Sequence, residues 1–216
     1  MAAEAHARAT GKPGIVMVTR GPGLTNASAG IHVARQGSTP LIILIGMPAR
    51  ETERREAFQE LDIQAFGQVI GKDALIIRDP HRIGEQLSHA FHLSISGRPG
   101  PVLVGLPEDV LAEVIDEPSK TLFSPPVKPY AIPTPKLLER AAKIIARSKK
   151  PFVVAGGAGW TSEASLSLER FVTRFGIPVA AAWRRQDVLD NSNPYYAGHM
   201  GLGINPNLAE RIRSAD

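Results

Sequence analysis

The chain has 216 residues, 43% of them hydrophobic and 21% charged, which is typical of a folded globular protein and excludes a disordered or fibrous one. It contains no cysteine, so disulfides, thiolate nucleophiles and cysteine metal sites are excluded. The net charge is +4, but the densest charged stretch, residues 50–56, alternates in sign, so we expect a solvated surface and no nucleic-acid partner. Apolar runs far shorter than the roughly 20 residues of a membrane span, and an N-terminus unlike a secretory signal, predict a cytoplasmic protein without a membrane partner.

Four short apolar runs alternate with helical patterns in the first half of the chain. The runs lie at residues 15–18, 41–45, 75–77 and 102–104, and the helical patterns at about 24–36, 60–66 and 80–94. Apolar runs without alternation indicate strands buried on both faces, as in a parallel sheet between helices. Residues 1–115 are therefore predicted to form an α/β domain with a doubly wound parallel sheet.

Prolines concentrate in the next segment, residues 116–135, which has neither helical nor strand periodicity. Because proline fixes φ and removes a backbone donor, this segment is predicted to be an extended linker between two domains.

The α/β pattern resumes over residues 136–216. Helical patterns occupy 136–148 and 162–175, strand patterns occupy 152–155 and 177–182, and a third helix is expected at 205–214, with Asn205 as N-cap and Pro206 in the first turn. Two strands do not form an independently stable sheet, so we expect the first half of a truncated second domain, with an unpaired sheet edge.

Two glycine-rich turns follow predicted strands. Gly21-Pro22-Gly23 is expected between a strand and a helix, where a backbone can approach a ligand closely and helix N–H groups face an anion or a polar ring. A plain strand-to-helix turn is the alternative. Gly156-Gly157-Ala158-Gly159 resembles a nucleotide-binding turn but lacks the G-x-G-x-x-G spacing.

Other catalytic patterns are missing from the sequence. The six histidines are scattered, and neither a G-x-S-x-G elbow nor a P-loop occurs. We assign no catalytic residue and no metal ligand.

Several short motifs, in order along the chain, resemble thiamine-diphosphate-dependent enzymes of the acetolactate synthase type. They are residues 10–14, 19–26 (Thr-Arg-Gly-Pro-Gly-Leu-Thr-Asn), 38–41, 57–60 (Ala-Phe-Gln-Glu), 96–102 and 106–110. Residues 1–115 resemble the pyrimidine-binding domain of that family without its first part. Residues 136–216 resemble the first half of its central domain.

The resemblance implies a cofactor and the residues that bind it. Enzymes of this family decarboxylate a 2-oxo acid and join the product to a second carbonyl compound, as in branched-chain amino acid biosynthesis. Pro22 and Asn26, with Gly21 and Gly23, would border the aminopyrimidine of thiamine diphosphate, and Gln59, also a cofactor-binding candidate, would face the active-site entrance with Phe58. Phe58 would face the substrate channel, with ordinary packing as an equal alternative. Lys72 resembles a residue near that channel, although a solvated position is preferred.

FAD is a second candidate cofactor, because many acetolactate synthases bind it in the central domain. Gly156, Gly157 and Gly159 match the turn that would approach it. The segment 183–187, Trp-Arg-Arg-Gln-Asp, departs from the pattern of flavin-binding members.

Two features of the family are missing from these residues. The family's activating glutamate would precede the position of Met1, and Glu4 is out of register inside the following helix. The strings Gly-Asp-Gly and Asn-Asn, which hold Mg²⁺ and the diphosphate in a further domain, do not occur. We therefore expect a fragment that is inactive alone and acts as a homo-oligomer or with a complementary chain.

Three other interpretations stay open. The parent enzyme could be a related decarboxylase or carboligase of the glyoxylate or oxalyl-CoA type. The chain could also be a non-catalytic partner of a full-length homologue, or a nucleotide-binding module that uses the turn at Gly156.

Overall fold

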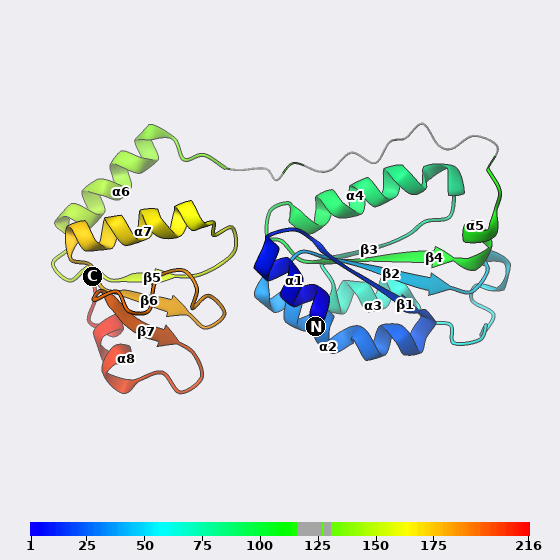
Figure 1. Ribbon diagram of the computed structural model, residues 1–216, viewed down its shortest axis with the longest axis horizontal. Helices are drawn as coiled ribbons and strands as arrows, with labels where there is room; N and C mark the ends of the chain where they lie inside the picture. Colours follow the sequence, from blue (N-terminus) through cyan, green and yellow to red (C-terminus); the bar gives the residue numbers. More distant parts are fainter. Residues whose placement is uncertain (116–126, 128–130) are drawn as a thin grey trace. The chain divides into compact units, whose positions relative to one another are not determined.

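The computed structural model describes residues 1–115, 127 and 131–216. The chain divides into two compact units, Met1–Pro129 and Tyr130–Asp216. Each contains a parallel sheet with helices packed on it (Figure 1), which confirms the predicted α/β class. Most of the predicted linker lies outside the described residues, so its extended structure and the domain boundaries stay predictions.

Four parallel strands form the sheet of the first unit, in the order β1-β2-β4-β3. They are β1 (Gly14–Thr19), β2 (Leu41–Met47), β3 (Asp73–Ile76) and β4 (Pro101–Pro107). Every residue of β4 is buried. Its unbroken apolar run therefore has the cause inferred from the sequence, since a strand covered on both faces needs apolar residues at every position.

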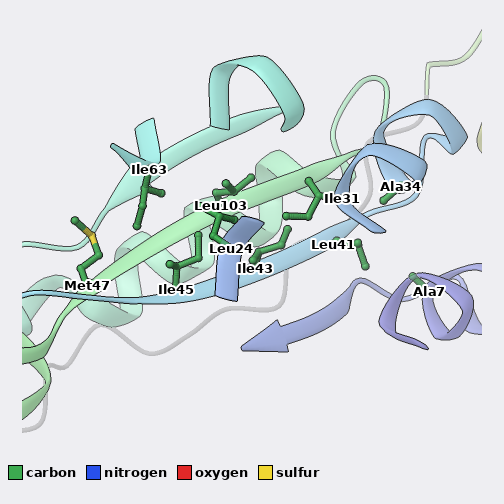
Figure 2. Close-up of a cluster of buried hydrophobic side chains, with 10 residues drawn as sticks. All are labelled: Ala7, Leu24, Ile31, Ala34, Leu41, Ile43, Ile45, Met47, Ile63 and Leu103. Carbon is green, nitrogen blue, oxygen red and sulfur yellow. The ribbon is translucent and has the colours of Figure 1, made fainter. Parts of the chain in front are cut away.

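Three helices cover one face of this sheet. They are α1 (Ala2–Thr10), α2 (Arg20–Gly37) and α3 (Ile63–Ile70). Their buried side chains pack on alternate residues of β2 and on Leu103 of β4 (Figure 2); the cluster consists of Ala7, Leu24, Ile31, Ala34, Leu41, Ile43, Ile45, Met47, Ile63 and Leu103.

The opposite face is covered by α4 (Ile83–Ile95), which follows the 3-10 helix η2 (Pro80–Arg82). Its buried Ala90 packs in a second cluster with Ile42, Val102 and Val104. This cover does not extend over the edge strand β1, where Ile15 is 54% exposed and Met17 is 73% exposed.

The second unit has three parallel strands in the order β5-β6-β7. The elements are α6 (Pro135–Arg147), β5 (Val153–Ala155), α7 (Ser162–Phe175), β6 (Val179–Ala182), β7 (Tyr196–Met200) and α8 (Pro206–Arg213). Asn205 accepts a hydrogen bond from the N–H of Asn207, and Pro206 lies in the first turn, so the expected start of α8 is confirmed. Across the described part of the chain, no helix is both long and apolar enough to cross a bilayer.

Three expectations about elements were wrong. The expected two-strand sheet has a third strand, β7, whose sequence Tyr-Ala-Gly-His-Met lacks an apolar run. Gly21, Pro22 and Gly23 do not precede the helix but form the first turn of α2, which begins at Arg20; proline is tolerated there because first-turn N–H groups have no partner inside the helix. The short helix expected at 60–66 is α3 and begins at Ile63, where Asp62 caps it by accepting from the N–H of Ala65.

Candidate cofactor-binding site

The carboxyl edge of the first sheet brings two predicted segments together. Gly21 lies just after β1, and its N–H donates to the carbonyl of Gln59 over 2.9 Å. A Cβ added at Gly21 would lie 2.9 Å from that same carbonyl oxygen, so the contact requires glycine. The structure thus joins the start of α2 to the Phe58–Gln59 segment, 38 residues away in sequence, at the edge where parallel α/β sheets bind their ligands.

The other predicted residues of α2 follow Gly21 along the helix. Pro22 and Asn26 are exposed, while Gly23 packs against Val18, whose Cβ would lie 3.1 Å from an added Cβ. The hydroxyl of Thr25 donates to the carbonyl of Pro22 over 3.0 Å, which stabilises the first turn. The side chains of Asn26 and Gln59 are both exposed, and both are therefore open to a ligand.

The side chain of Arg20 connects the same two segments. Its Nη1 donates to the carbonyl of Phe58 over 3.0 Å, and its Nη2 donates to Oε2 of Glu108 over 2.8 Å. Phe58 is 73% exposed, with the Arg20 guanidinium 5.8 Å from its ring centre. Exposure of a large aromatic ring at this edge is compatible with the predicted channel role of Phe58.

The loop before Gln59 is closed by Glu60, which the sequence analysis did not single out. Its carboxylate accepts from the N–H of Arg54 over 2.6 Å and from the N–H of Ala57 over 3.0 Å. The loop borders a pocket of about 560 Å³. Apolar side chains and several carboxylates line this pocket: Met47, Leu61, Ile63 and Ile76, with Glu53, Glu56, Glu60 and Asp62, together with Arg54, Ala57, Gln59 and Gln64.

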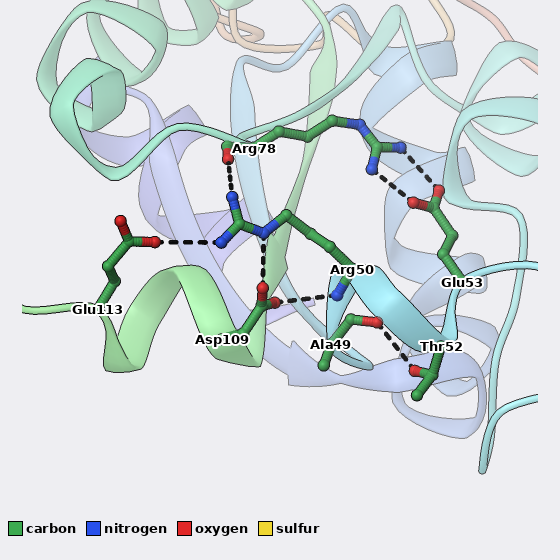
Figure 3. Close-up of polar contacts among 7 residues, drawn as sticks. All are labelled: Ala49, Arg50, Thr52, Glu53, Arg78, Asp109 and Glu113. Carbon is green, nitrogen blue, oxygen red and sulfur yellow. Dashed lines mark hydrogen bonds and ion pairs between the residues drawn. The ribbon is translucent and has the colours of Figure 1, made fainter.

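An ion-pair network holds the start of this loop (Figure 3). Arg50, in the 3-10 helix η1 (Arg50–Thr52), donates through Nε to Asp109 over 2.6 Å and through Nη2 to Glu113 over 3.1 Å. Its Nη1 donates to the carbonyl of Arg78 over 2.7 Å, and Nη2 of Arg78 donates to Glu53 over 2.7 Å. The alternating charges at residues 50–56 were expected to form a solvated surface. Two of them, Arg50 and Glu53, also pair with residues distant in sequence.

The network shifts the ionisation of its carboxylates. Burial raises the pKa of Asp109, but hydrogen bonds from the side chain and backbone of Arg50 outweigh it, and the pKa lies below its ordinary value. The hydrogen bond from Arg78 likewise lowers the pKa of Glu53. Both groups are held as carboxylates near neutral pH.

Lys72 lies at the amino ends of the strands, opposite to the carboxyl edge of the sheet, just before β3 begins at Asp73. Its Nζ donates to the carbonyls of Leu93 and Ser96 at the end of α4, the latter over 2.5 Å, and burial lowers its pKa. Since a parallel strand rises about 3.3 Å per residue, the two edges are roughly 20 Å apart. The structure does not bring Lys72 together with Gln59.

Glu4 is also remote from that edge. It is buried in α1, forms an ion pair with Arg8, and accepts from the hydroxyl of Thr39, just before β2, over 3.3 Å. Within the described residues, no group of three or more histidine or acidic side chains could hold a metal ion.

The glycine turn of the second unit follows β5. A Cβ at Gly156 would lie 2.5 Å from Cβ of Ala182, so this glycine permits close packing on β6. Trp160 Nε1 donates to the carbonyl of Gly156 over 2.9 Å and closes the turn. Gly157 and Gly159 have left-handed backbones, with φ of 81° and 90°, and both are exposed.

The chain belongs to the thiamine pyrophosphate enzyme family. Residues 1–66 match the thiamine pyrophosphate enzyme N-terminal TPP binding domain, and residues 138–216 match the central domain of the same enzymes. The first match includes the contact between Gly21 and Gln59, and the second includes the turn at Gly156. The family inferred from the sequence motifs is confirmed.

Within that family the chain is similar to acetolactate synthase large subunits. It is 35% identical over 206 residues to the acetolactate synthase large subunit of Cyanidium caldarium, covering 93% of this chain and 35% of that protein. Identity is 34% over 203 residues to the large subunit of Corynebacterium glutamicum, with 93% and 32% coverage. It is 35% over 206 residues to the probable large subunit of Methanocaldococcus jannaschii, with 93% and 35% coverage. The chain thus spans about a third of the length of these curated relatives.

Proposed function

We propose that this chain supplies the pyrimidine side of a thiamine diphosphate site in an acetolactate synthase-type enzyme, which decarboxylates a 2-oxo acid and joins the product to a second carbonyl compound. The contact between Gly21 and Gln59 is the observation that carries the proposal, because it unites the segment that the family resemblance assigns to the aminopyrimidine with the segment that it assigns to the active-site entrance. Similarity to acetolactate synthases over 93% of the chain supports the choice of reaction.

The side chains at this edge fit an aminopyrimidine. Asn26 and Gln59 offer hydrogen-bonding groups of both kinds, as a ring with amino and imino nitrogens requires. Gly21 lets the backbone approach closely, and the exposed ring of Phe58 offers an apolar wall. Bound thiamine diphosphate supplies the electron sink for loss of CO₂; the residues of this chain bind and orient the pyrimidine.

The diphosphate and Mg²⁺ belong, in this proposal, to a region outside these 216 residues, since the sequence lacks Gly-Asp-Gly and Asn-Asn. A dianion bridged by Mg²⁺ needs carboxylate or amide oxygens as ligands. A second subunit or a complementary chain in the cytoplasm would provide them. No residue of this chain is assigned a catalytic role.

Activity and binding measurements test the proposal. We expect no acetolactate from pyruvate when the chain is assayed alone with thiamine diphosphate and Mg²⁺, and measurable turnover would contradict the proposed division of the site. The pyrimidine half of the cofactor, 4-amino-5-hydroxymethyl-2-methylpyrimidine, is expected to bind the chain in calorimetry. Gly21→Ala should abolish this binding, because the new Cβ would meet the carbonyl of Gln59, whereas Arg82→Ala, which removes only the exposed ion pair with Glu85, serves as control.

FAD is a second proposed ligand, held by the glycine turn of the second unit. An added Cβ at Gly157 would meet no atom within 4 Å, so the backbone there is open to a ligand. Near this turn Arg184 lies 4.3 Å over the ring of Trp183, in the segment that departs from flavin-binding members. A pocket of about 560 Å³ in this unit lies instead between β7 and α8, where Asn205 and Arg211 line it.

Flavin titration tests this second ligand. Quenching of the two tryptophans, Trp160 and Trp183, should accompany FAD binding, because both lie in or beside the turn. Gly157→Val should weaken the binding, and unchanged binding would place FAD elsewhere.

A further inference from the structure

Strained backbone accompanies the contact between the two segments of the site. Arg20, the first residue of α2, has a φ of 48°, and Gln59 has a φ of 60°. Residues other than glycine rarely adopt this left-handed backbone conformation. It persists only where surrounding contacts enforce it. The backbone hydrogen bond from Gly21 to Gln59 is one such contact.

The guanidinium of Arg20 supplies the others. It donates to the carbonyl of Phe58 and to the carboxylate of Glu108, and so joins the start of α2, the loop and the start of α5 (Glu108–Ala112). The Arg20 side chain is only 22% exposed, although that of Glu108 is 58% exposed. A planar guanidinium reaches two acceptors in fixed directions, which a lysine ammonium does not reproduce.

We propose that Arg20 is a positioning residue that holds the Phe58–Gln59 segment against the first turn of α2, through its hydrogen bonds to Phe58 and Glu108. Arg20 itself does not touch the pyrimidine. The assignment of a pyrimidine to this edge rests on the proposed function, whereas the restraint on the loop does not.

The start of α5 anchors the loop a second time. Asp109, next to Glu108, accepts from both the backbone N–H and the Nε of Arg50, at 3.0 and 2.6 Å. Two adjacent carboxylates thus hold two arginines, one beside Gly21 and one at the beginning of the loop. Loss of Arg20 leaves the loop tied at Arg50 and closed by Glu60, but removes the side-chain hydrogen bond that holds Phe58 at its far end.

Amide hydrogen exchange tests the restraint on the full 216-residue chain without any ligand. We expect Arg20→Ala to speed exchange of the Gly21 N–H at least about tenfold, because this N–H donates to Gln59, and Arg20→Lys to restore only part of the protection. Arg82→Ala, which removes the exposed pair with Glu85 on α4, is the matched control and should leave Gly21 unchanged. Amides of β2 and β4 report whether each variant keeps the fold; Glu108→Gln carries the same test if Arg20→Ala does not fold. Unchanged exchange at Gly21 overturns the proposal.

Titration with 4-amino-5-hydroxymethyl-2-methylpyrimidine separates positioning from general stability. We expect about tenfold weaker binding to Arg20→Ala, an intermediate effect in Arg20→Lys, and wild-type binding to Arg82→Ala. Equal binding to wild type and Arg20→Ala overturns the positioning role. If the wild type does not bind the pyrimidine while exchange at Gly21 still responds to Arg20→Ala, the proposed function fails and the restraint stands.

Discussion

The two units of this chain use the same architecture but bury it to different degrees. In the first, helices on both faces enclose β2 and β4, and ten buried residues form one cluster on a single face. In the second, α7 packs on one face of a three-stranded sheet, while every residue of α6 is exposed. Leu137, Leu138, Ile144 and Ile145 of α6 are between 41% and 62% exposed.

The exposed apolar side chains of the second unit show which of its elements depend on contacts outside the unit. Val153 and Ala155 pack in the core cluster beneath α7, whereas Val154, which points to the opposite face, is 48% exposed. Apolar surface of this kind, on a helix and a strand of the same unit, is typical of an interaction site. The second unit is therefore expected to depend more on association than the first.

The largest expected effect concerns the core of the first unit. Leu103→Ala removes a side chain that is fully buried in the cluster of Figure 2, and should lower the free energy of unfolding by about 2–5 kcal/mol. Both tryptophans lie in the second unit, so their fluorescence reports its unfolding separately from the circular dichroism of the whole chain. We expect Leu103→Ala to shift the circular dichroism transition and not the fluorescence transition. Leu111→Ala, at a residue that is 57% exposed, is the control, and a shift of both signals would show that the two units unfold together.

Substitutions in α6 are expected to have a smaller effect on stability but a clear effect on association. Because Leu138 and Ile144 are exposed, replacing both by serine should change the free energy of unfolding by no more than about 0.5 kcal/mol per site. The same double variant should reduce self-association in sedimentation velocity, while Arg140→Ser, on the same helix, should not. A decrease of more than about 2 kcal/mol in the free energy of unfolding of the double variant would mean that Leu138 and Ile144 are buried in solution.

The smallest expected effect concerns the ion pair between Glu53 and Arg78, which holds the loop of the first unit. The pKa of Glu53 lies below its ordinary value of 4.5 because Arg78 donates to its carboxylate. The carboxylate therefore contributes stability above pH 4.5, and this contribution is lost as the pH falls through the lower pKa of the folded state. Arg78→Gln should return the pKa of Glu53 toward 4.5 in carboxyl carbon NMR titrations. Arg82→Gln should leave it unchanged, and a Glu53 pKa insensitive to Arg78 would contradict the ion pair.

Part of the site could be predicted from the sequence. The motifs at 19–26 and 57–60 indicated the two segments, and the structure places them in contact through Gly21 and Gln59. Their roles toward a ligand stay predictions. Arg20 was not singled out, because a single arginine beside a glycine has no local pattern, and its partners Phe58 and Glu108 are 38 and 88 residues away. Glu60 was not singled out for a different reason: it accepts backbone N–H groups of its own loop, from Arg54 and Ala57, and no motif marks that role.

The strands of the first unit, the class of the fold and the family could all be predicted from the amino-acid sequence. Buried strands and capped helices leave local signals, such as the unbroken apolar run of β4 and the Asn205-Pro206 start of α8, because burial and capping act on neighbouring residues. Three features emerge only in the folded chain: Gly21 lies inside the first turn of α2, β7 is a strand, and Arg20 and Arg50 meet adjacent carboxylates of α5. Those features depend on pairing and ion contacts between residues far apart in the chain, whose free energy exists only once the strands have brought them together.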